Sequence, residues 1–173
     1  HGWNALATVF SPEVQAHYIQ GMSIAWRNIK PERPKTTGPN TFTTKHTSTL
    51  AVDAIELESL VEPAWSSSLS AGEARLASRH IAMAGSLRAP YFERLFLSHR
   101  DQVLPVVVEG ARIEFRSGGI YRDILSHAAH SETSILRPVA TEVLRLLRAG
   151  EPADKSGLDY CISILKRGLD TLP

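Results

Sequence analysis

The residues best suited to chemistry form a short polar group, in which His127, His130 and Glu132 give the pattern His-x-x-His-x-Glu. On a helix, His127 and His130 would share a face because residues three apart are neighbours. Imidazole and carboxylate groups are common zinc ligands. No cysteine and no second histidine pair lies nearby in the sequence, so a polar helix end is the simpler interpretation. A small helical metal-binding domain or enzyme using these three residues is one alternative.

Cys161 is the single cysteine and could act as a nucleophile with a histidine as its base. It lies on the apolar stripe of a predicted helix, where cysteine behaves as a small hydrophobic residue. The chain also lacks the Gly-x-Ser-x-Gly elbow and the glycine-rich phosphate-binding patterns. We therefore predict no catalytic residue, no cofactor and no nucleotide hydrolysis within this chain.

Arg137, Arg145 and Arg148 fall on roughly one surface of a predicted helix. Such a stripe could bind the phosphates of a nucleic acid or an acidic partner. Aromatic residues do not alternate with these arginines, which argues against a surface that stacks on bases. We predict these three arginines as interaction residues, with a protein as the favoured partner and nucleic-acid binding as a second alternative.

The favoured explanation of the arginines is local pairing. Glu142 lies three residues before Arg145, and Glu109 lies three residues before Arg112. Opposite charges at this spacing on a helix attract each other. We therefore expect an ion pair within each of the two helices.

A short pattern, Pro-Val-x-x-Glu-x-x-Arg, occurs at residues 105–112 and again at 138–145. Leu-Ser-His precedes each copy, at residues 97–99 and 125–127. Proline is tolerated in the first turn of a helix, so each copy would open the second helix of a pair. This places the start of the first of these helices near Leu104. The sequence thus predicts two copies of a helix pair.

The predicted pairs cover residues 90–116 and 120–149. Helix pairs of this length are typical of an α-solenoid, in which each pair buries its face against the next. We expect an all-α fold made of stacked helix pairs, an α-solenoid-like array of the HEAT or TPR kind. The other predicted helices follow Ser11, span 46–61, follow Ser70, and run from about residue 158 to Gly168.

One single helical domain is expected over residues 1–173, as a piece of a larger protein because the chain starts at His1. Residues 31–44 are rich in Pro, Thr, Gly and Asn, and we predict a long loop there. Residues 41–44 are β-prone but have no evident partner strand. The net charge of +1 provides no general basic field, and no apolar run reaches the roughly 20 residues of a membrane span. We expect a cytoplasmic protein without membrane contact.

Five stretches resemble a known family: Pro-Asn-Thr at 39–41, Pro-Ala-Trp at 63–65, Leu-Ser-x-x-Glu-Ala-Arg-Leu-Ala-x-Arg at 69–79, and the segments 119–126 and 146–153. They are similar to helical segments in the C-terminal regions of very large bacterial STAND-type ATPases, many of them linked to antiphage defence. In that family the helical array recognises a trigger protein or mediates assembly, and a separate module carries the nucleotide site. No nucleotide-site residue can be carried over, because the phosphate loop is missing.

The sequence therefore predicts a non-catalytic helical interaction or scaffold module. The resemblance implies the sensor region of a bacterial defence NTPase.

Overall fold

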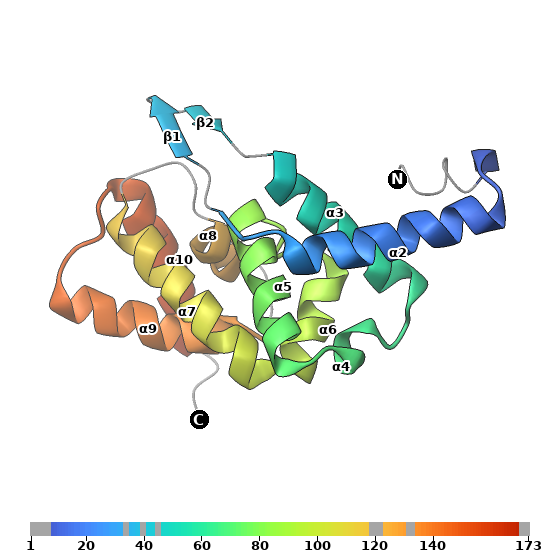
Figure 1. Ribbon diagram of the computed structural model, residues 1–173. Coiled ribbons are helices and arrows are strands. Elements are labelled where there is room, and N and C mark those ends of the chain that lie inside the picture. The colour runs from blue at the N-terminus through green and yellow to red at the C-terminus, as the bar shows by residue number, and fades with distance from the viewer. Residues whose placement is uncertain are drawn as a thin grey trace.

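The computed structural model describes residues 8–32, 35–38, 41–43, 46–117, 123–130 and 134–169. These residues form helices and one short hairpin, so the predicted helical fold is confirmed (Figure 1). The elements are α2 (Pro12–Asn28), β1 (Lys35–Gly38), β2 (Thr41–Thr43), α3 (His46–Val61), α4 (Trp65–Ser68), α5 (Ala71–Ala84), α6 (Pro90–Ser98), α7 (Arg100–Arg116), α8 (Asp123–His130), α9 (Leu136–Ala149) and α10 (Lys155–Leu169).

The prediction of a loop over residues 31–44 was wrong for residues 35–38 and 41–43, which form two strands. Strands β1 and β2 pair antiparallel, with Lys35 opposite Thr43 and Thr36 opposite Phe42. The partner missed in the sequence is Lys35–Gly38, whose two threonines are β-branched and suit a strand. A hairpin needs only local pairing, so β2 pairs with the strand that directly precedes it in the chain.

Side-chain caps define several helix ends as the sequence predicted. The Ser70 hydroxyl accepts the amide N–H of Glu73, and the Glu73 carboxylate accepts the amide N–H of Ser70, which is a full capping box at the start of α5. The same helix ends at Gly85, whose φ of 70° lies in the left-handed region that glycine adopts at no steric cost. The Ser11 hydroxyl accepts the amide N–H of Val14 at the start of α2.

Helix α7 begins at Arg100, four residues before the predicted start near Leu104, so Pro105 lies inside the helix. Proline removes the N–H that would reach the carbonyl of Asp101. Both residues are exposed, so water can solvate that carbonyl. In α9 the matching Pro138 does lie in the first turn. After α3 ends at Val61, residues 65–68 form the single-turn helix α4.

The helices pack in two layers, and from α3 onward successive helices of the chain lie alternately in one layer and the other. In the first layer α3, α5, α7 and α9 lie side by side in that order, each packed against the next-but-one helix in the chain. In the second layer α4 packs against α6, and α8 packs against α10. Helix α2 covers α3 and part of α5 at one end, and Figure 1 shows its N-terminal half extending beyond α3.

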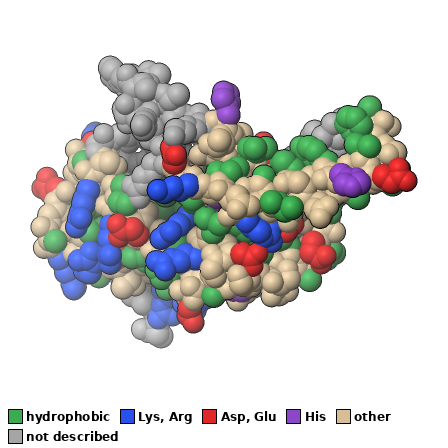
Figure 2. Space-filling view, in the orientation of Figure 1, with side chains coloured by type: hydrophobic (Ala, Val, Ile, Leu, Met, Phe, Trp, Pro, Cys, Tyr) green, Lys and Arg blue, Asp and Glu red, His purple; other side chains and the backbone are tan. Residues whose placement is uncertain are grey.

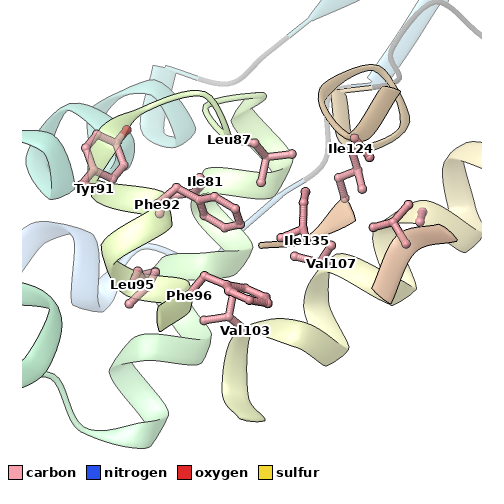
Figure 3. Packing of buried hydrophobic residues seen from close by; sticks show 14 of the residues in the cluster. Ile81, Leu87, Tyr91, Phe92, Leu95, Phe96, Val103, Val107, Ile124 and Ile135 are labelled. Carbon is pink, nitrogen blue, oxygen red and sulfur yellow. The ribbon is translucent and has the colours of Figure 1, made fainter. Parts of the chain in front are cut away.

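The core lies between the layers and consists of aliphatic and aromatic side chains (Figure 3). Phe92 and Phe96 of α6 meet Ile81 of α5 and Val103 of α7 there, all nearly inaccessible to solvent. Ile124 brings α8 into the same cluster. Burial of these side chains is the main term that holds the layers together, at about 25 cal/mol per Å² of apolar surface.

Among the helices in the described part of the chain, none has the length and apolar character that crossing a membrane requires.

Helix α10 approaches α9 so closely at Gly168 that a Cβ there would lie 2.5 Å from the Cβ of Ala140. We predict that Gly168→Ala lowers the free energy of unfolding by about 1–3 kcal/mol, because neither backbone can move away cheaply. The matched control is Gly21→Ala in α2, where a Cβ meets nothing within 4 Å. That change should raise stability by about 1 kcal/mol through helix propensity. Urea denaturation of both variants checks the pair, and equal effects would contradict the close approach.

Candidate functional site

The two copies of the repeated pattern meet at one carboxylate. Glu142 of α9 accepts hydrogen bonds from Arg145 on its own helix, Nη2 to Oε1 at 2.6 Å and Nε to Oε2 at 3.1 Å. It also accepts a bond of 2.7 Å from Nε of Arg112 on α7. Arg112 in turn lies 3.5 Å from Glu109. These four residues are named the Glu142 cluster below.

The Glu142 cluster is held at the boundary between core and solvent. The Glu142 side chain is only 9% exposed, whereas that of Arg145 is 54% exposed. Hydrogen bonds from Arg145, together with those from Arg112, outweigh the opposing effect of burial and lower the pKa of Glu142 to about 2. The ionised Glu142 carboxylate, hydrogen-bonded by two guanidinium groups, therefore joins α7 to α9.

The predicted intrahelical pairs are confirmed, but the sequence did not predict the pair between Arg112 and Glu142. That contact crosses thirty residues of chain, and only the packing of α7 on α9 creates it. The one available signal was that the repeat places equivalent charges on two helices that a solenoid would set side by side.

Arg137 and Arg148, predicted with Arg145 as interaction residues, are both exposed on α9. Exposed arginines also lie on the neighbouring helices, at Arg116 of α7 and at two positions of α5. Figure 2 shows lysine and arginine side chains gathered over α5, α7 and α9. We name this surface the arginine face and define it by Arg75, Arg79, Arg112, Arg116, Arg137, Arg145 and Arg148.

A second charged cluster joins α2, α3 and α5. Arg27 contacts Glu58 at 2.9 Å and Glu73 at 2.6 Å, and its guanidinium lies 4.3 Å from the ring centre of Trp26. Trp26 and Ser23 also donate to Glu58. Although burial opposes ionisation of Glu58, these hydrogen bonds lower its pKa. These contacts anchor α2 on α3 and α5.

Glu114 is a buried carboxylate with a structural role. Its two oxygens accept the amide N–H groups of Ile124 and Leu125, at 3.1 and 2.9 Å. These amides belong to the first turn of α8, where helix geometry leaves N–H groups without partners and favours a negative charge. Glu114 of α7 therefore caps α8 from outside that helix, a contact that sequence spacing did not reveal.

Of the predicted metal ligands, His127 and His130 differ in their exposure to solvent. His127 is buried, and burial lowers its pKa, with nearby Arg88 acting in the same direction. His130 is exposed, and its Nδ1 lies 2.8 Å from the carbonyl oxygen of Ser126 while its ring meets Tyr160 edge to face. Glu132 lies outside the described residues. Within the described ranges, no three His, Cys, Asp or Glu side chains gather to hold a metal.

Cys161 is buried in α10 at the centre of an apolar stretch, as its place on the apolar stripe predicted. It lies in the same core cluster as Ile164, so it packs as a small hydrophobic residue there.

No protein-family model, curated protein or solved structure matches this chain.

The low pKa of Glu142 predicts a pH dependence of stability. A carboxyl group whose pKa falls from 4.5 when unfolded to about 2 when folded contributes stability above pH 4.5, and that stability is lost as the pH falls toward 2. We expect Glu142→Gln to be less stable than the parent protein at pH 7 by about 1 kcal/mol, because both arginines stay partly solvated. The difference should shrink toward pH 2.5 in denaturation curves.

The acidic range also titrates Glu73, whose pKa is held at about 2 by hydrogen bonds from Ser70 and Arg27. The quantity to follow is therefore the difference in free energy of unfolding between Glu142→Gln and the parent protein at each pH, because the contribution of Glu73 is common to both. A difference that stays constant from pH 7 to 2.5 would contradict the ionised Glu142 cluster.

The cap on α8 gives a separate prediction. Glu114→Ala should expose α8 to local unfolding and cost about 1–3 kcal/mol, since two buried amide groups lose their acceptor. Glu114→Gln keeps one oxygen acceptor and should cost less. Hydrogen exchange measured on Ile124 and Leu125 reports the effect directly, and unchanged protection in the alanine variant would show that another group caps the helix.

Proposed function

We propose that this chain is a non-catalytic helical interaction or scaffold module. The observation that carries the proposal is the alternating packing of α3, α5, α7 and α9, with α8 against α10 in the second layer. Such alternation is what stacked helix pairs produce, so it supports an α-solenoid-like array of the HEAT or TPR kind. Arrays of this kind present extended surfaces to partners.

The Glu142 cluster supports the same proposal. In a stacked array, corresponding helices of successive pairs lie side by side, and α7 and α9 carry the two copies of Pro-Val-x-x-Glu-x-x-Arg. Arg112 of the first copy donates a hydrogen bond to Glu142 of the second copy. A bond between these two matching positions supports a repeat unit rather than a chance match of eight residues.

The resemblance to the C-terminal arrays of bacterial STAND-type ATPases extends the proposal. It suggests that the module is the sensor region of a bacterial cytoplasmic defence NTPase, where it would recognise a trigger protein. The exposed arginines Arg137, Arg145 and Arg148 are the candidate contacts. Their charge also favours nucleic-acid phosphates as a second candidate function, because phosphate contacts provide much of the affinity for nucleic acids.

Site-specific photo-crosslinking tests the proposal. A photoreactive amino acid is placed at Arg79 of α5, Thr141 of α9, Leu97 of α6 or Asp159 of α10, all of them exposed positions. An interaction module should give one defined protein adduct from one face in extracts of the source cells, and weak or no adduct from the other faces. Absence of a defined adduct at all four positions would remove the proposed function.

A further inference from the structure

We infer that the arginine face of α5, α7 and α9 binds an acidic segment of a partner protein. The inference rests on the proposed function, because it names the kind of partner that an interaction module would use. It commits to carboxylates, carried by aspartate and glutamate side chains, as the groups that the arginines contact.

Charge is unevenly distributed over the molecule. The whole chain has a formal net charge of only +1. The outer surfaces of α5, α7 and α9 nevertheless carry the seven arginines defined above. The acidic side chains of these helices are Glu73, Asp101, Glu109, Glu114 and Glu142, of which Glu73 is paired with Arg27 and Glu114 and Glu142 are buried. The exposed side of α3 instead carries Asp53. This separation produces a local positive potential that attracts an acidic segment and increases its rate of association.

Periodicity explains why the arginines share one side of the layer. On α5, Arg75 and Arg79 are four residues apart, opposite the buried Ala74, Ala77 and Ile81. The exposed arginines of α7 and α9 likewise lie opposite the core residues of their helices. Because these three helices are neighbours in one layer, their outer surfaces form one continuous face.

The structure contains an example of the recognition chemistry. The fork of Arg145 binds both oxygens of Glu142, while Arg112 donates to one of them from the neighbouring helix. Arginines of adjacent helices in this layer therefore reach a single carboxylate together. Planar guanidinium groups match carboxylates through paired hydrogen bonds, and the exposed arginines along the same face can bind a partner in this way.

Two observations favour a protein over a nucleic acid. Among the described residues, α5 and α9 contain no aromatic side chain, and Phe115 of α7 is buried, so bases have no stacking platform on this face. In addition, Glu109 is 59% exposed in the middle of the face and would repel a continuous phosphate backbone. A peptide can place its carboxylates selectively at the arginines and avoid this position.

The test measures binding of labelled polyglutamate and of a short DNA duplex by fluorescence anisotropy at low and physiological salt. The main variant is Arg75→Glu/Arg79→Glu, which leaves the Glu142 cluster untouched. The matched control is Lys155→Glu/Lys166→Glu on α10, which makes the same change in charge at exposed positions outside the arginine face. Circular dichroism and thermal unfolding establish that each variant is folded.

We expect polyglutamate to bind the parent protein and to bind the α5 variant about tenfold more weakly. The affinity of the control variant for polyglutamate should differ from that of the parent protein by about twofold or less. Arg75→Lys/Arg79→Lys keeps the charge but removes the planar fork and should fall between the two. This variant also serves if the charge-reversed protein does not fold, since a conservative change that leaves affinity unaltered contradicts the recognition of carboxylates.

Three results would overturn the inference: no binding of polyglutamate at low salt, equal losses in the α5 variant and the control, or tighter binding of duplex DNA with a steep salt dependence. Failure here is distinct from failure of the proposed function. If polyglutamate does not bind but a defined protein crosslinks at Leu97, the interaction module stands and this face is not its binding surface.

Discussion

The constraint on which the structure depends is the close packing of α7 between its neighbours. Val103, Val107 and Ala111 on its buried face have no exposed surface, and α7 contacts α5, α6, α8 and α9. Small and β-branched side chains let the neighbouring helices approach α7 closely. Helix α7 therefore contacts helices of both layers. The Glu142 cluster is possible only because this packing brings Arg112 within reach of α9.

Polar side chains repeatedly complete the ends of helices to which they do not belong. Glu114 of α7 caps the start of α8, while Ser163 and Arg167 of α10 donate to the carbonyls of Ala129 and Ala128 at its end. His99, at the end of α6, lies 2.7 Å from the carbonyl oxygen of Ser66 in α4. Helix ends leave backbone groups without partners, and a short helix such as α8 depends on neighbours to supply them. The helices are therefore stable as an array rather than singly, as expected for the stacked pairs we propose.

The same arrangement separates structural charges from surface charges. Glu142, Glu58 and Glu114 are largely buried and bonded, so their charges serve to join helices. Arginines that lie on the outer side of the same layer remain open to solvent, as Arg75, Arg79 and Arg148 are. One layer thus provides both a rigid support and a basic surface, and this combination underlies the proposed role in binding an acidic protein segment.

Local signals were sufficient for much of the helical pattern. The capping box at Ser70, the end of α5 at Gly85 and the pairing of Glu142 with Arg145 all involve residues within a few positions of each other, so the sequence alone determined them. On α2, Met22 and Trp26 are buried whereas Val14 and Tyr18 are exposed, because the N-terminal part of α2 extends beyond α3. The contact of Arg112 with Glu142, the burial of His127 and the cap supplied by Glu114 were decided by tertiary structure. Each depends on which helices become neighbours, and that follows from packing of the whole core rather than from spacing along the chain.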